Sequence, residues 1–139
     1  MEQAGYSGTP LAKKLGIKEG FSIILYNQPE YYFKLFTDMP KNLEQLEKDQ
    51  LQDVDFIHLF CTRFEELKTV SERYKPRLKP NGLLWISWPK GTSGIKTDLK
   101  RDTIREYMLF IGLVDVKVAA IDNEWSGLKF VYRLKDRTQ

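Results

Sequence analysis

The residues best suited to bind an anion lie in one loop and at the strand end before it. Residues 87–98 read SWPKGTSGIKTD, in which Lys90, Ser93 and Lys96 supply cationic and hydroxyl donors. The two glycines permit unusual backbone angles, and a helix expected to begin near Thr97 would direct its amino terminus toward the same place. Since the segment matches no known phosphate-loop motif, a solvated basic loop is the alternative to an anion site.

The single histidine and the single cysteine are further candidates for chemistry. His58 lies within an apolar run, residues 54–61, which favours a buried, hydrogen-bonded imidazole over a catalytic one. Cys61 ends that run and would become nucleophilic only if a cation such as Arg63 lowered its pKa. The two residues are three apart, hence on opposite faces of a regular strand, and we expect no catalytic pair. One cysteine also excludes a disulfide framework and a zinc site built from several cysteines, so we expect no metal.

Length and composition indicate one globular domain. The chain has 139 residues, of which 42% are hydrophobic and 29% charged, values typical of a single domain. We expect a flexible or surface-draped lead over residues 1–8 and a folded core over residues 9–139. Neither a membrane-spanning apolar run nor a signal sequence is present, which predicts a cytoplasmic protein without a membrane span.

Charge is distributed less evenly than the net value of +3 implies. Residues 73–105 hold nine Lys and Arg against two Asp, a formal charge of +7, whereas residues 38–72 hold four basic and nine acidic residues, a formal charge of −5. A basic face could bind nucleic acid through phosphates. Opposite faces could instead pair two copies in a homo-oligomer. The residues that would contact nucleic acid are Lys90, Lys96, Lys100 and Arg101.

The apolar pattern predicts strands that alternate with helices. Strands are expected at residues 21–26, 54–61, 83–88, 115–121 and 128–133, with helices at 9–16, 29–36, from 42, at 62–74 and at 97–111. This order predicts an α/β protein with a three-layer, Rossmann-like sheet of about five strands, mainly parallel with an antiparallel C-terminal edge hairpin. We expect the first three strands side by side, the last strand beside the third, and the fourth at the edge.

Capping residues mark where several helices should begin. Asn42 and Gln45 have the spacing of a reciprocal cap, Thr62 and Glu65 that of a capping box, and Thr97 or Asp98 could cap the helix after the basic loop. Residues 78–82 read as a turn before the third strand.

Several segments resemble class I S-adenosylmethionine-dependent methyltransferases in their order along the chain. Residues 15–25 (LGIKEGFSIIL) resemble the lead into their first strand, 55–59 (DFIHL) their fourth strand, 78–84 (LKPNGLL) their fifth, and 112–133 their terminal hairpin. The resemblance implies a truncated methyltransferase-like fold.

The same resemblance points to a degenerate cofactor site. Members of the family follow the first strand with a glycine-rich turn, and an acidic residue at the end of the second strand holds the ribose hydroxyls. Here residues 27–30 (NQPE) contain no glycine, and residues 37–53 show no second strand with an acidic end. Side chains at a close-approach turn would occupy space that the cofactor needs, and Pro29 lacks a backbone donor. We therefore expect no cofactor.

A second resemblance spans nearly the whole chain. The chain is similar to a family of small uncharacterised bacterial proteins, with no assigned reaction, that share the motifs GYSGTPL at 5–11, KLGI at 14–17, WPK at 88–90, TDL at 97–99, GLVDVKV at 112–118 and WSGLK at 125–129.

The sequence thus favours a non-catalytic, regulatory module that binds a small molecule or an anion. Ligands of such sheets gather at the carboxyl ends of the parallel strands, which predicts a site formed by Asn27, Thr62, Ser87, Lys90, Ser93 and Lys96. Two alternatives remain open: an atypical S-adenosylmethionine-dependent methyltransferase, and a nucleic-acid-binding protein that uses residues 73–105.

Overall fold

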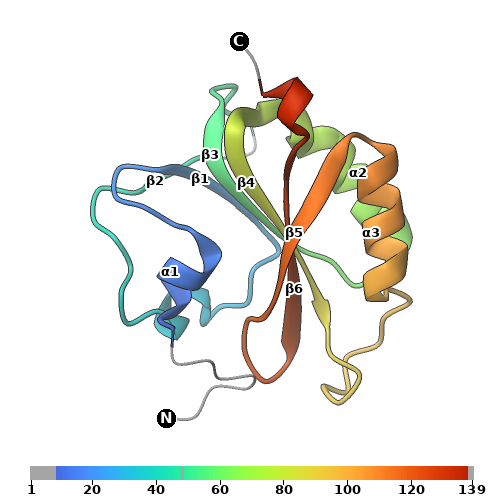
Figure 1. The fold of residues 1–139 in the computed structure, drawn as a ribbon. Coiled ribbons are helices and arrows are strands. Elements are labelled where there is room, and N and C mark those ends of the chain that lie inside the picture. Colours follow the sequence, from blue (N-terminus) through green and yellow to red (C-terminus); the bar gives the residue numbers. More distant parts are fainter. Residues whose placement is uncertain (1–8, 48, 138–139) are drawn as a thin grey trace.

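Six strands form one mixed sheet in the computed structural model, which describes residues 9–47 and 49–137. They are β1 (Ser22–Tyr26), β2 (Glu44–Gln45), β3 (Val54–Phe60), β4 (Leu78–Pro89), β5 (Leu113–Ala120) and β6 (Trp125–Tyr132). The order across the sheet is β2-β1-β3-β4-β6-β5, with the first four strands parallel and β6 antiparallel to both of its neighbours (Figure 1). The expected α/β class, the parallel centre and the antiparallel C-terminal edge are confirmed. The predicted lead at residues 1–8 lies outside the described residues.

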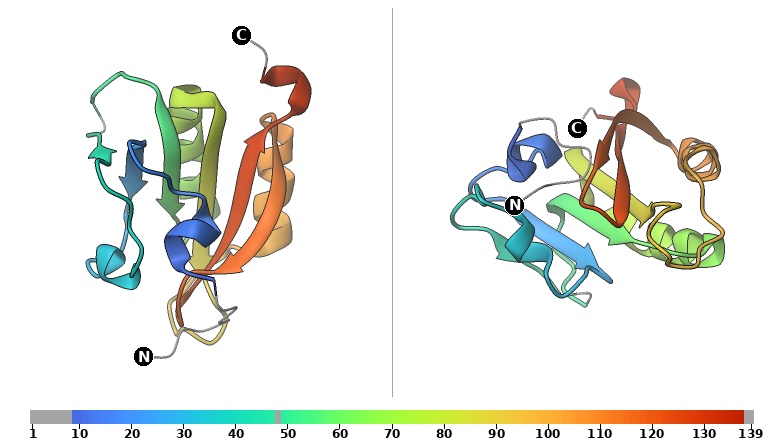
Figure 2. Two further views of the ribbon diagram at one scale, coloured as in Figure 1. Left: turned by 60° about the vertical axis from the view of Figure 1, so that its left-hand side comes forward. Right: turned by 90° about the horizontal axis from the view of Figure 1, so that it is seen from below.

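Helices cover both faces of the sheet. The helical elements are α1 (Leu11–Leu15), α2 (Phe64–Tyr74), α3 (Arg101–Phe110) and the short 3-10 helices η1 (Tyr32–Leu35), η2 (Lys75–Arg77) and η3 (Leu134–Asp136). Figures 1 and 2 show α2 and α3 on one face, and α1 and η1 on the other. Each face therefore has its own apolar core.

The residues of the central strand β3 explain why the sheet must be covered on both faces. Along β3, Phe56 and Phe60 pack toward α1 and η1, whereas Ile57 and Leu59 pack toward α2 and α3. All four side chains are fully buried. A strand that is apolar on both faces is stable only between two covering layers, so the continuous run in the sequence predicted this layering.

The second strand was not predicted. In place of the helix expected from Asn42, the backbone of β2 pairs with β1, and the amides of Glu44 and Leu46 donate to the carbonyls of Phe21 and Ile23 at 2.9 Å each. Asn42 itself adopts a positive φ of 62°. Few apolar residues lie in this segment, and tertiary pairing overrides a weak helical preference.

The predicted helix starts were displaced because the capping groups differ from those expected. Glu66, not Glu65, accepts a hydrogen bond from the amide of Thr62 at 3.0 Å. Asp98 caps α2 rather than α3, accepting from the amide of Phe64 at 2.7 Å. The helix after the basic loop consequently begins only at Arg101.

Two further segments differ from prediction. The helix expected over residues 29–36 is reduced to η1. Residues 78–82 form the first part of β4 rather than a separate turn, with a shift in register against β3 between the pairs Val54–Leu78 and Phe56–Leu83.

Candidate functional site

The carboxyl ends of β1, β2, β3 and β4 meet at one edge of the sheet. The turn after β1 begins at Asn27, which adopts a left-handed conformation with φ of 55°. Asparagine tolerates this region better than most residues other than glycine. The Asn27 side chain reaches across to β3, with Nδ2 3.5 Å from the carbonyl oxygen of Phe60. The turn therefore has a glycine-like backbone at its first residue despite its lack of glycine.

An acidic residue follows the second strand. β2 ends at Gln45, Leu46 is buried, and the side chain of Glu47 is exposed. The expectation that residues 37–53 contain no second strand is wrong, because a strand of two residues is too short to produce a recognisable pattern. Glu47 is thus a candidate that the sequence analysis missed, and a single acidic residue in a polar segment offered no distinguishing signal.

The basic loop is tied to the start of α2. Thr97 donates its hydroxyl proton to the carbonyl oxygen of Thr62 at 2.6 Å, and the amide of Asp98 donates to the same oxygen at 3.2 Å. The Ser93 hydroxyl donates to the Lys90 carbonyl at 2.8 Å and accepts from the amide of Ile95 at 3.1 Å. These bonds hold the loop across the end of β3.

Three of the predicted ligand residues lie at this edge with groups open to solvent. Asn27 and Lys96 are exposed, and Lys90 is half-buried with its amide bonded to the Glu124 carbonyl at 2.8 Å. Thr62 is half-buried, and its backbone anchors the loop.

Ser87 lies beneath the edge rather than on it. Its hydroxyl is 2.8 Å from Nε2 of His58, and Nδ1 of His58 is 3.0 Å from the hydroxyl of Tyr32. All three residues are buried. Burial lowers the pKa of His58 to about 3, so the imidazole is neutral. The expected buried, hydrogen-bonded histidine is confirmed, and Ser87 has no surface to offer a ligand.

Cys61 faces the opposite core. It packs with the apolar residues under α2 and α3, away from His58, as the spacing of three predicted. Burial and then the nearby carboxylate of Glu66 raise the pKa of the thiol, which leaves it protonated and unreactive.

The basic run at residues 73–105 does not form one surface. β4 separates it, with Arg73 to Lys79 at the start of the strand and Lys90 to Arg101 beyond its end. Several of its cations are already engaged: Arg77 donates to the carbonyl of Gln52 at 2.9 Å, and Lys79 pairs with Asp55 at 3.1 Å. Charge counted along the sequence therefore overstates the charge on any one face.

The lysines that do gather come from distant parts of the chain. Lys117 and Lys129 are directly opposite each other on β5 and β6, and Lys117 Nζ lies 3.2 Å from the carbonyl oxygen of Lys14. No sequence pattern linked these residues, since more than 100 positions separate Lys14 from Lys117.

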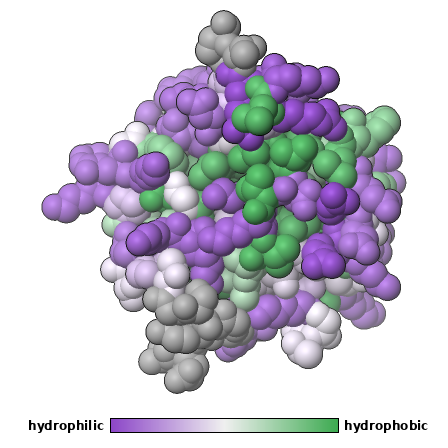
Figure 3. Space-filling model, in the orientation of Figure 1, coloured by the Kyte–Doolittle hydropathy of each residue, from purple (hydrophilic) through white to green (hydrophobic). Residues whose placement is uncertain are grey.

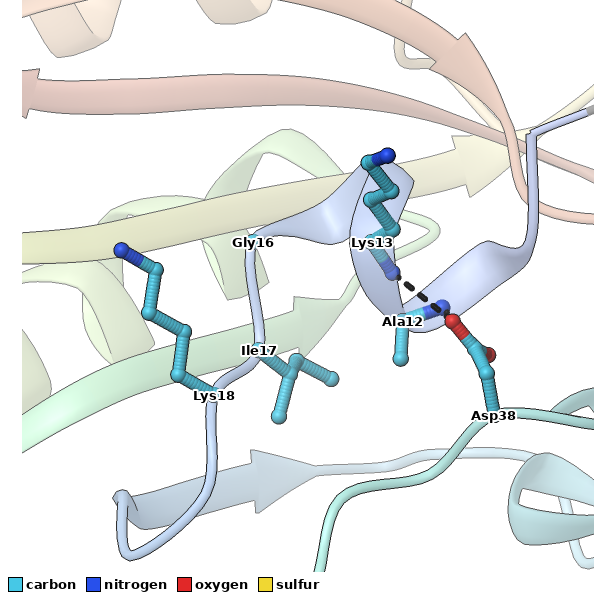
Figure 4. Close-up of a pocket in the computed structure, with 6 residues that line it drawn as sticks. All are labelled: Ala12, Lys13, Gly16, Ile17, Lys18 and Asp38. Carbon is cyan, nitrogen blue, oxygen red and sulfur yellow. Dashed lines mark hydrogen bonds between the residues drawn. The ribbon is translucent and has the colours of Figure 1, made fainter.

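A small pocket lies beside α1. Its volume is about 190 Å³, and its lining residues, drawn in Figure 4, are Ala12, Lys13, Gly16, Ile17, Lys18 and Asp38. The Asp38 carboxylate accepts from the amides of Ala12 and Lys13 at 3.0 and 3.1 Å, and so caps α1. The pocket is smaller than the sites of ordinary cofactors, and its one carboxylate is committed to the helix.

The strand order and the two covering layers define a Rossmann-like, methyltransferase-like fold, and known structures share it. A S-adenosylmethionine-dependent methyltransferase from Aquifex aeolicus superimposes with a TM-score of 0.59 at 18% identity, over 86% of each chain. Fibrillarin from Aeropyrum pernix, in complex with natively bound S-adenosylmethionine, gives a TM-score of 0.60 at 12% identity, over 86% of this chain and 72% of its own. A ribosomal protein L11 methylase from Lactobacillus delbrueckii subsp. bulgaricus gives 0.59 at 10% identity, over 87% and 74%. No family model and no curated protein sequence matches the chain.

These structures correct the expectation that no cofactor is involved. That expectation rested on the turn without glycine and on the missing second strand. Of the solved proteins that share the fold, the one from Aquifex aeolicus is a S-adenosylmethionine-dependent methyltransferase, and the fibrillarin holds natively bound S-adenosylmethionine. Proteins of this fold thus include ones that bind S-adenosylmethionine, so the fold speaks against the expectation of no cofactor.

No helix in the described part of the chain is long and apolar enough to cross a membrane.

Proposed function

We propose that the chain binds S-adenosylmethionine at the carboxyl edge of β1, β2 and β3 and is an atypical S-adenosylmethionine-dependent methyltransferase. Two features at this edge support the proposal most directly. Asn27 adopts a left-handed conformation after β1, and an exposed Glu47 follows β2. When bound, the cofactor would supply an activated methyl group.

The residues present fit two parts of such a molecule. Because Asn27 has φ of 55°, the backbone after β1 can turn sharply without a glycine. The Glu47 carboxylate is an acceptor suited to a pair of ribose hydroxyls. Pro29 offers no backbone donor, and η1 takes the place of a longer helix. These two departures make the proposed site atypical.

The catalytic proposal replaces the non-catalytic module expected from the sequence. The argument for that module was the turn without glycine, together with a missing second strand with an acidic end. In the structure Asn27 gives that turn a positive φ, and β2 is followed two residues later by Glu47. Ser87 is left out of the proposed site because its hydroxyl is buried against His58.

Binding is tested first by calorimetry on the full chain with S-adenosylmethionine and S-adenosylhomocysteine. We expect the substitution Glu47→Gln to weaken binding by about tenfold or more, since hydrogen bonds to a charged group contribute about 1.5–3 kcal/mol. Glu44→Gln is the matched control, because Glu44 is an exposed glutamate on β2, three residues before Glu47. Absent binding by the wild type, or equal losses in both variants, would contradict the proposed site.

Catalysis is tested separately, by transfer of a tritiated methyl group from S-adenosylmethionine into an extract of cells that lack this protein. Label that depends on the wild type and is reduced in Glu47→Gln supports a methyltransferase. Binding without any transfer would overturn the catalytic part of the proposal.

A further inference from the structure

A cluster of lysines surrounds the carboxyl end of α1, on the face opposite α2 and α3. Lys14 comes from α1, Lys117 from β5 and Lys129 from β6, with Lys18 just beyond α1 and Lys90 just beyond β4. Figure 3 views this face, where hydrophilic side chains cover α1 and its border with β5, beside the apolar surface of β5.

The Lys14 ammonium group donates a hydrogen bond to a neutral carbonyl oxygen, a contact that leaves its charge unpaired. The residue keeps only 7% of its surface exposed, and its Nζ reaches the carbonyl oxygen of Ala120 at 3.4 Å. Within the described ranges no carboxylate lies within 4.0 Å of this ammonium group. An ammonium group has three protons to donate, and a buried cation is normally paired.

Lys117 and Lys129 add like charge at the same place. They are directly opposite each other in the antiparallel pair, an arrangement that destabilises a sheet. Lys117 Nζ lies 3.2 Å from the carbonyl oxygen of Lys14, and Lys129 Nζ lies 3.6 Å from the position that a Cβ on Gly16 would occupy. The ammonium groups of Lys117 and Lys129 thus lie at the carboxyl end of α1.

The electrostatics agree with this geometry. Burial, followed by the charges of Lys117 and Lys90, lowers the pKa of Lys14. Burial, followed by the charges of Lys117 and Lys18, lowers the pKa of Lys129. The charged neighbours that lower these two pKa values are all lysines. The lysines therefore repel one another, and a bound anion would relieve the repulsion.

We propose that Lys14, Lys117 and Lys129 form a binding site for a phosphate group that carries more than one negative charge. Lysine binds phosphate as a compact point charge, and several neighbouring ammonium groups suit a highly charged group. Lys14, Lys117 and Lys129 are not among the residues proposed to hold S-adenosylmethionine, and each proposal can fail without the other. Lys117 also caps the carbonyl end of α1, so the decisive variant is Lys129→Met, which keeps the apolar stem and removes the charge.

The test uses inorganic tripolyphosphate as the probe, at low ionic strength, with thermal unfolding and calorimetry as readouts. We expect tripolyphosphate to raise the unfolding midpoint of the wild type, and Lys129→Met to weaken binding by about tenfold or more. Without the probe, Lys129→Met should raise the midpoint, because it removes repulsion. Lys135→Met, which removes an exposed lysine in η3, is the matched control and should bind like the wild type.

A second arm distinguishes the source of the phosphate. A short single-stranded RNA that binds more tightly than tripolyphosphate, and loses affinity in Lys129→Met, identifies a nucleic-acid backbone as the source. Binding of tripolyphosphate alone identifies a free phosphate compound. The proposal is overturned if neither probe binds, if Lys135→Met and Lys129→Met lose affinity equally, or if Lys129→Met lowers the midpoint without the probe.

Discussion

The hydroxyl of Tyr32 lies 3.0 Å from Nδ1 of His58, in the core between the sheet and η1. On its other side, the imidazole meets the hydroxyl of Ser87 at 2.8 Å. Both ring nitrogens are therefore hydrogen-bonded within the protein, which compensates the burial of a polar ring. Because η1 supplies Tyr32, this chain of bonds fastens the irregular segment after β1 to the sheet.

Acid should destabilise the fold through His58. Its pKa is about 3 in the folded protein against 6.5 for the ordinary group, so the unfolded chain binds a proton first. The stabilising contribution is complete above pH 6.5 and is lost progressively as the pH falls toward 3. We expect a loss of about 2 kcal/mol in the free energy of unfolding between pH 7 and pH 5 from this group. Urea denaturation at a series of pH values measures it.

The variant His58→Gln provides the control for this pH dependence. Glutamine retains hydrogen-bonding groups but does not titrate, so the decline between pH 7 and pH 5 should be smaller by that amount, whatever the stability at pH 7. An unchanged slope would show that other groups cause the acid sensitivity.

Asp98 should contribute to the stability of α2 although it lies 34 residues after the helix start. Replacement by alanine removes the acceptor for the amide of Phe64, and a lost cap costs about 1 kcal/mol. Chemical denaturation measures the change. Asp49→Ala removes an exposed carboxylate outside the helices and should change stability by less than about 0.5 kcal/mol. Similar losses in both variants would contradict the capping role.

Gly127 should not accept a side chain. A Cβ there would lie 3.0 Å from Trp85 Cε3 and 3.0 Å from Ile121 Cδ1. Trp85 is fully buried and donates its indole proton to the carbonyl of Leu15 at 2.9 Å, so it cannot yield easily. We expect Gly127→Ala to cost about 1–3 kcal/mol. Gly91→Ala, where nothing lies within 4 Å of the added Cβ, should be nearly neutral, and a denaturation curve of each variant decides the matter.

The Cys61 thiol should be inert in the folded protein. It is fully buried, and burial raises its pKa above the ordinary range. A thiol reagent such as dithionitrobenzoate should react at once in guanidinium chloride but, in native buffer, only as fast as the structure opens. Rapid native labelling would show that the end of β3 is open to solvent.

The sequence was sufficient to predict the order of the main strands. The runs that contain Ile24, Ile57 and Ile86 are long and apolar, and each could be stable only within a sheet covered on both faces. The same reasoning placed His58 in the core and Cys61 on the other face, because side chains alternate along a strand.

The tertiary structure decided the features that depend on partners far along the chain. Glu44 and Gln45 form a strand only because the backbone of β1 offers its free edge, and Asp98 caps α2 only because the loop returns to Thr62. The lysine cluster likewise requires α1 to pack against β5 and β6. Local propensity reports how a segment prefers to fold by itself, whereas hydrogen bonds and charge repulsion depend on distances that only the folded chain creates.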